Sequence, residues 1–175
     1  MNISKTSPRD DAWSFAVRSA VPDDAPVLAD FVNVLSRSFG DEENCTADQI
    51  RANWLNFDAY IAECDGTPSA YLLGYPTYKP QIDARGFEIE NLFVAAERRG
   101  RGLGRRLLQS IIDEKRAAGI TRFTLSTRAD RPDLLAFYEA AGFRRVKTGN
   151  LARFIEDRAG PQTSDQNSSP PPTLN

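Results

Sequence analysis

Apolar residues recur at helical spacing in two long stretches of the chain. The first stretch follows Pro22 and ends before the acidic loop 40–43. Its apolar stripe consists of Val27, Leu28, Phe31, Val32 and Leu35. The second lies ahead of Gly119, and its stripe consists of Leu103, Leu107, Leu108, Ile111 and Ile112. We therefore predict two amphipathic helices, each of which buries one face.

Shorter signals predict the remaining elements. Thr46 is a suitable N-cap for a helix that runs to about Leu55, and Pro132 opens a short helix that ends at Gly142. The stretch 76–86 is expected to be a loop or the ragged end of a hairpin. Runs rich in β-branched and aromatic residues predict strands at 15–18, 59–64, 69–75, 87–94, 121–127, 143–147 and 151–155.

The order of these elements predicts the fold class. The turn signal Asp65-Gly66 joins the strands at 59–64 and 69–75, which are therefore expected to be antiparallel. The strands at 87–94 and 121–127 flank a helix, so we expect them to be parallel with a right-handed crossover. The prediction is an α/β domain with a single mixed, mainly antiparallel sheet and helices on both faces.

Length and composition describe an ordinary globular domain with polar ends. In the 175 residues we expect a flexible N-terminus at 1–14, a single folded domain at 15–158 and a disordered tail at 159–175. A net charge of -2 gives no reason to expect nucleic acid or an anionic membrane as partner. No apolar run approaches the roughly 18 residues of a membrane span. Two cysteines without metal-like spacing fit a reduced, cytoplasmic setting.

The sequence contains no histidine, which removes several kinds of active site. Nucleophile pairs of the Ser-His-Asp and Cys-His types and the HExxH zinc site are excluded. A general acid or base must then be Glu, Asp, Tyr, Lys, Cys or water. We expect no metal cofactor.

A turn rich in glycine and arginine, Arg99-Gly100-Arg101-Gly102-Leu103-Gly104-Arg105, connects a predicted strand to a predicted helix. Glycines in such a turn permit positive φ and let the backbone approach a ligand closely. The backbone N–H groups of the turn and the positive end of the helix dipole together favour an anion. A pyrophosphate is the expected ligand, with arginine side chains screening its charge.

Other interpretations of this turn have less support from the surrounding residues. A P-loop requires a Lys after the glycines, and none stands there. The dinucleotide fingerprint GxGxxG needs a third Gly where Arg105 stands, and an acidic residue where Arg128 follows the next strand. A nucleic-acid patch is disfavoured because the arginines lack interleaved aromatic residues. The remaining alternative is that the turn merely connects the strand to the helix, with its arginines exposed to solvent.

Two motifs resemble those of a known family. Arg99, Gly102 and Gly104 match the pattern Arg/Gln-x-x-Gly-x-Gly/Ala, and residues 137–143 read Phe-Tyr-Glu-Ala-Ala-Gly-Phe. Over residues 15–157 the chain resembles the GCN5-related N-acetyltransferases (GNAT), nearest in pattern to the diamine, or spermidine/spermine-type, acetyltransferases.

The resemblance implies acetyl-CoA as co-substrate. It implies that Leu92, Phe93 and Val94 lie along the pantetheine arm through backbone hydrogen bonds. The residues implied to bind the pyrophosphate are those of the turn, namely Arg99, Gly100, Arg101, Gly102, Leu103, Gly104 and Arg105. Arg131 departs from the pattern, because many members carry there an Asn that contacts the cofactor.

Acetyl transfer to an amine needs a base, because an ammonium with a pKa near 10.4 cannot attack while it is protonated. By resemblance to the diamine acetyltransferases, Glu90 is the first candidate, and Glu88 on the same face of the strand is the alternative. Tyr138 is implied to lie beside the thioester sulfur as the acid. The structural alternatives are that the two glutamates only face solvent and that Tyr138 is only a core aromatic.

The expected function is N-acetyl transfer from acetyl-CoA to a primary amine by direct attack in a ternary complex. We favour a small amine or diamine, because residues 75–80 resemble the matching segment of spermidine/spermine-type enzymes and because Asp41, Glu42 and Glu43 would attract a polycation. The alternatives are a non-catalytic acyl-CoA-binding sensor or interaction module, and a protein or peptide N-acetyltransferase. Relatives often pair through C-terminal strands, so the resemblance also allows a homodimer.

Overall fold

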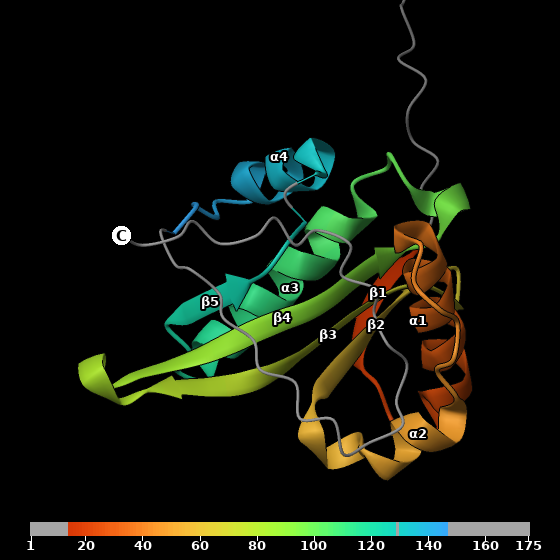
Figure 1. Cartoon of the computed structure of the whole chain (residues 1–175), viewed down its shortest axis with the longest axis horizontal. Helices are drawn as coiled ribbons and strands as arrows, with labels where there is room; N and C mark the ends of the chain where they lie inside the picture. The colour runs from red at the N-terminus through yellow and green to blue at the C-terminus, as the bar shows by residue number, and fades with distance from the viewer. Residues whose placement is uncertain (1–13, 129, 147–175) are drawn as a thin grey trace, which may run out of the picture.

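The central element is one five-stranded sheet whose strands lie side by side in sequence order (Figure 1). The computed structural model describes residues 14–128 and 130–146. The strands are β1 Phe15–Ser19, β2 Asp58–Cys64, β3 Thr67–Lys79, β4 Ala84–Val94 and β5 Arg122–Leu125. The first four pair antiparallel, and β4 pairs parallel with β5. The expected single mixed sheet is therefore confirmed.

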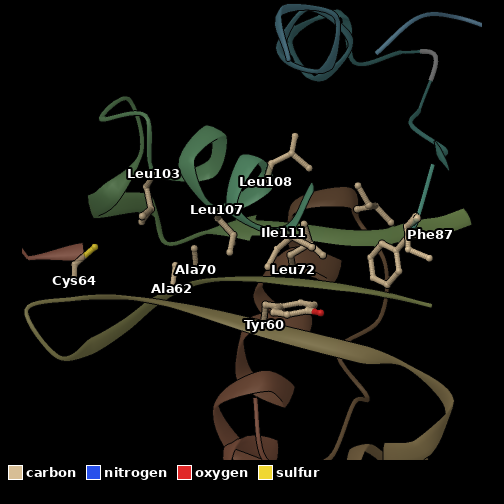
Figure 2. Close-up of a cluster of buried hydrophobic side chains, with 12 residues drawn as sticks. Tyr60, Ala62, Cys64, Ala70, Leu72, Phe87, Leu103, Leu107, Leu108 and Ile111 are labelled. Carbon is tan, nitrogen blue, oxygen red and sulfur yellow. The ribbon is translucent and has the colours of Figure 1, made fainter. Parts of the chain in front are cut away.

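Helices cover both faces of the sheet, as the sequence predicts. On one face, α1 (Ala25–Phe39) and α2 (Ala47–Ala52) bury apolar side chains against β2, β3 and β4. On the other face lies α3 (Leu103–Ala117), with partly buried residues of α4 (Pro132–Ala140) packed against the same core. Figure 2 shows the second core, where Leu103, Leu107, Leu108 and Ile111 of α3 lie over Tyr60, Leu72 and Phe87 of the strands.

Capping residues set the ends of α1 and α2. Gly40 ends α1 with a φ of 80°, a left-handed conformation that glycine adopts without steric cost. Thr46 begins α2 as half of a capping box, in which its side chain accepts from the N–H of Gln49 and the Gln49 side chain binds back. The predicted continuation toward Leu55 is a separate 3-10 turn at Trp54–Asn56.

Of the two alternatives for 76–86 the loop is wrong and the hairpin end is confirmed, because β3 and β4 continue into a long hairpin there. Their pairing runs out to Lys79 opposite Ala84, with a 3-10 turn at Pro80–Ile82, and Figure 1 shows this hairpin reaching away from α1. Pro76 lacks an N–H and signals a strand end. It is tolerated here because β2 pairs with β3 only as far as Gly74, and no other described strand pairs with that edge of β3 beyond this point.

The predicted C-terminal strands are not supported where they can be compared. Residues 143–146 form no strand, and the Phe143 N–H donates instead to the Tyr138 carbonyl. The expected strand at 151–155, the tail at 159–175 and all but the last residue of the N-terminus at 1–14 lie outside the described residues. Within residues 14–128 and 130–146, no helix combines the length and the apolar character needed to cross a bilayer.

Candidate functional site

The sheet opens into a cavity where β4 and β5 part. Their pairing ends at Ile89 opposite Leu125, yet β4 continues to Val94. A cavity of about 1000 Å³ occupies the space beyond. Its lining comes from β4 residues 90–94, the Gly-Arg turn, residues 126–128 after β5, the inner side of α4 and the C-terminal end of α1. This volume suits a ligand well above the size of a single amine.

The turn presents open backbone to this cavity. Gly100 and Gly102 have φ values of 74° and 77°, which an L side chain rarely adopts. A Cβ added at either glycine would meet no atom within 4 Å. Gly102 is the N-cap of α3, and no side chain caps that end of the helix. The first N–H groups of α3 therefore remain available to an anion, as the sequence predicts.

Gly104 has a different role from the other two glycines of the turn. A Cβ at Gly104 would lie 3.2 Å from Cγ2 of Val94 and 3.7 Å from Cζ of Phe137. Absence of a side chain thus lets the first turn of α3 pack closely between β4 and α4. Leu103 is 1% exposed and anchors the same turn in the core. These two residues hold the turn in place beside the cavity.

The arginines of the turn are placed less uniformly than expected. Arg99 lines the cavity, but its Nε donates to the Val94 carbonyl at 2.8 Å. Arg105 also lines it, and its Nη2 donates to the Ala140 carbonyl at 3.1 Å. Arg101 is exposed and is not part of the lining, whereas Arg98, which the sequence did not single out, is. The backbone of the turn is therefore the better candidate for the main anion contact.

Glu90 owes its position to a β-bulge. Leu73 pairs with Asn91 and the next residue, Gly74, pairs with Ile89, so Glu90 is an extra residue in β4. Its carboxylate accepts a hydrogen bond from the Tyr75 hydroxyl at 3.1 Å, and Tyr75 pairs directly with Glu88. Burial raises the pKa of Tyr75, and the Glu90 and Glu88 carboxylates raise it further. Both carboxylates thus lie on one face, as predicted.

Only one of the two carboxylates reaches the cavity. Glu90 is part of its lining and Glu88 is not. Glu88 instead accepts a short hydrogen bond from the Thr124 hydroxyl on β5, the strand that pairs with this part of β4. The geometry therefore favours Glu90 over Glu88 as the carboxylate that can meet a bound amine.

Tyr138 lies on the opposite wall of the cavity, on α4. Its ring makes edge contacts with Phe137 and Phe143, at centroid distances of 5.1 and 5.8 Å. Burial raises the pKa of Tyr138 to about 12. The phenol therefore keeps its proton throughout the neutral range and can act as a hydrogen-bond donor.

The far end of the cavity contains residues that the sequence analysis did not assign to the site. Arg128 and Arg131 lie over the ring of Phe39 at the end of α1, at 5.9 and 5.7 Å from its centroid. Each guanidinium also pairs with a nearby carboxylate, Asp130 and Asp133 respectively, and Arg131 lowers the pKa of Asp133 to about 2. Arg131, which departs from the family pattern, is thus held at the cavity wall by Asp133 and Phe39.

The acidic loop contributes less to the cavity than expected. Of its three acidic residues, only Asp41 is among the lining residues. Glu43 is engaged by the Arg37 guanidinium of α1, with Nε donating to Oε1 at 2.6 Å. Glu42 is exposed outside the lining. Any attraction of this loop for a cationic ligand therefore depends mainly on Asp41.

Comparison with known proteins agrees with the motifs. The family model for the acetyltransferase (GNAT) family matches residues 28–143. The protein named probable N-acetyltransferase family 8 member 5 from Mus musculus is 26% identical over 99 residues, which cover 55% of this chain and 44% of the mouse protein. IAA acetyltransferase from Azospirillum brasilense is 41% identical over 64 residues, covering 35% of this chain and 42% of that protein. The matched regions span less than half of each curated relative.

A solved structure extends the comparison to the whole fold. Ribosomal-protein-alanine N-acetyltransferase from Brucella melitensis biovar Abortus 2308 superimposes with a TM-score of 0.71, covering 81% of this chain and all of that chain. Its sequence identity is 15%. At that identity the likeness establishes the shared fold and leaves the acceptor open.

Proposed function

The chain belongs to the acetyltransferase (GNAT) family, and we propose that it transfers the acetyl group of acetyl-CoA to a small primary amine or diamine. The observation that carries the proposal is the arrangement of one cavity. Open glycine backbone at a helix N-terminus lies at one side of it, and Glu90 and Tyr138 line the same space. An anion site, a base and a proton donor are thus available to one ligand pair.

The residues present fit the co-substrate. The N–H groups around Gly100 and Gly102 would hold its pyrophosphate, with Arg98 as an additional cation. The edge of β4 from Leu92 to Val94 is not covered by β5 and would accompany the pantetheine arm. When bound, acetyl-CoA supplies the thioester whose acetyl group is transferred.

Glu90 and Tyr138 would then carry the proton movements. Keeping an aliphatic amine neutral at pH 7 costs about 4 kcal/mol, because its pKa lies roughly three units higher. Glu90 offsets this cost by accepting the proton from the attacking nitrogen. Tyr138 donates a hydrogen bond to the departing sulfur and stabilises the negative charge that develops there. With a pKa of about 12 against roughly 8.5 for a free thiol, the phenol is the weaker acid, so it holds the departing sulfur as a hydrogen-bonded thiolate.

The preference for a small amine or diamine is supported by charge and by the hairpin. Glu90, Glu88 and Tyr75 form a polar, acidic surface beside the cavity, and Asp41 adds a carboxylate at its α1 end. Such a surface favours a cationic acceptor. The paired arginines at Phe39 are each matched by an aspartate, so they do not reverse this balance.

The direct test is release of free thiol from acetyl-CoA with a panel of acceptors. The panel contains diamines and polyamines, monoamines, amino acids, aminoglycosides, and peptides with free N-termini or lysines. We expect the highest kcat/KM with a small amine or diamine. Tight binding of acetyl-CoA without thiol release in any reaction would contradict the proposal and favour a sensor. Preference for a peptide would contradict the acceptor class alone.

A further inference from the structure

The hydroxyl of Tyr71 is a polar group buried in the α1 core. Tyr71 lies on β3 and is 0% exposed, with its ring against Phe31 and Phe93 at centroid distances of 6.0 Å each. Among the described residues, none accepts or donates a hydrogen bond at its hydroxyl oxygen. A phenylalanine would fill the same space without this cost, so an unpaired buried hydroxyl calls for an explanation.

The polar groups that act on this hydroxyl lead to the cavity. Leu73 pairs with Asn91, so Tyr71 and Asn91 are diagonal neighbours on one face of the sheet. Burial raises the pKa of Tyr71 well above its usual range, the Cys45 thiol and the Glu90 carboxylate raise it further, and the Asn91 amide opposes them. Asn91 and Glu90 both line the cavity.

On the α1 side of Tyr71, Asn33 fixes the loop that carries Cys45. Its side chain binds the backbone of Cys45 twice, with Nδ2 donating to the carbonyl at 2.9 Å and Oδ1 accepting from the N–H at 3.0 Å. The loop before α2 is therefore held against Tyr71.

We propose that Tyr71 is a positioning residue for Glu90, and that its hydroxyl and the Asn91 side chain hold one water molecule that donates a hydrogen bond to the Glu90 carboxylate. A buried water is stable when it has two to four polar partners, and Tyr71, Asn91 and Glu90 provide three. Tyr75 donates to the same carboxylate from the other side. The inference rests on the proposed function, in which Glu90 is the base.

Two donors on one carboxylate stabilise its charged form. The neighbours of Glu90 on the sheet are Tyr71 and Tyr75 on β3 and Glu88 on β4. The other titratable and charged groups that line its cavity are Asp41, Asp133, Tyr138, Arg98, Arg99, Arg105, Arg128 and Arg131. Glu88 is a second negative charge on the same face of the sheet. The two hydroxyl-linked donors would keep Glu90 ionised and oriented despite this neighbour.

The test measures the pKa of Glu90 directly, by following carboxyl carbon signals in an NMR titration and assigning Glu90 from the spectrum of Glu90→Gln. It compares the wild type with Tyr71→Phe, Tyr75→Phe and Tyr60→Phe. Tyr60 is the matched control, since it is a buried tyrosine whose hydroxyl pairs with Glu114 on the other face of the sheet. We expect the Glu90 pKa to rise by about half a unit or more in Tyr71→Phe and Tyr75→Phe, and to stay unchanged in Tyr60→Phe.

A structural role for Tyr71 predicts a different outcome. Loss of an unpaired hydroxyl would leave Tm unchanged or raised, and the Glu90 pKa would match the wild type. That result would overturn the inference. This titration requires no turnover, so it separates the inference from the proposed function, whose failure would appear as absence of thiol release.

Kinetics with the active amine then connect the pKa to the reaction. The acidic limb of kcat/KM against pH should move to higher pH in Tyr71→Phe by the same amount as the Glu90 pKa. In a Glu90→Gln background, the Tyr71→Phe change should have no further effect, because Tyr71 acts through Glu90. A full additional loss in the double variant would contradict the positioning role.

Discussion

At the scale of single residues, Glu90 is distinguished from Glu88 by contacts and not by residue type. Both carboxylates face the side of the sheet that carries Tyr75. Glu88 lies within the stretch of β4 that pairs with β5, and it is engaged by Thr124. Glu90 lies one residue beyond the last pair and borders the cavity. A difference of two residues therefore separates a structural carboxylate from one that can meet a ligand.

This difference predicts unequal effects of the two isosteric substitutions. Glu90→Gln should lower kcat by roughly 100-fold or more, because general base catalysis is lost. Glu88→Gln should lower it by less than about 10-fold, through the Thr124 contact alone. Steady-state kinetics at saturating acetyl-CoA and amine measure both, and calorimetry should show unchanged acetyl-CoA affinity. The reverse order would assign the base to Glu88.

The sequence identifies Glu90 but does not foretell the bulge that positions it. Simple alternation would place Asn91 and Phe93 on the face opposite to Glu90. The extra residue changes that, because Phe93 packs in the α1 core with Tyr71 whereas Ile89 and Leu92 contact the α3 core. A bulge depends on the pairing of two strands, so the residue types along one strand do not reveal it.

At the scale of elements, Gly74 makes the bulged β3–β4 pair possible. A Cβ at Gly74 would lie 2.3 Å from the Glu88 carbonyl oxygen and 2.6 Å from Cε1 of Phe87. Both distances are far below van der Waals contact, and the first partner is backbone that moves only with β4. Gly74 therefore fixes how closely the two strands approach beside Glu88 and Glu90.

Gly74→Ala should destabilise the protein by roughly 1–3 kcal/mol, as expected when a packed region is overfilled, and it should also lower kcat. Gly66→Ala is the control, since Gly66 has a φ of 73° in a turn with no atom near its added Cβ. Its cost should be limited to about 1 kcal/mol of backbone strain. Urea denaturation compares the two. The account of Gly74 fails if both variants lose the same stability and Gly74→Ala keeps full kcat.

Most elements could be predicted from the sequence, since helical periodicity and capping residues are local properties. The stripes of α1 and α3 and the cap at Thr46 lie where expected. The sequence could not decide between a loop and a hairpin end at 76–86, because Pro76 signals a strand end on its own, and only the absence of β2 beside it makes it acceptable in β3. The expected strand over 143–146 does not form, which shows that β-propensity along one segment does not by itself decide a strand.

At the scale of the whole molecule, the cavity exists because two strands part and three helices surround the gap. The motif residues predict one wall of it, at the turn and on α4. The opposite wall depends on α1 reaching the segment after β5, where Arg128 and Arg131 contact Phe39. Phe39 and the two arginines are about ninety positions apart in the chain. No local sequence pattern predicts such a contact. The site's extent is therefore a property of the fold.

The central claim is that the Gly-Arg turn binds acetyl-CoA, and calorimetry on two matched variants tests it most directly. Gly102→Asp and Gly66→Asp place the same residue at open glycines with φ of 77° and 73°, but only Gly102 lies at the N-terminus of α3 in the cavity. A carboxylate there would repel the phosphates. We predict that Gly102→Asp weakens acetyl-CoA binding by roughly 100-fold or more, while Gly66→Asp binds like the wild type. Equal affinity of Gly102→Asp and the wild type would contradict the account.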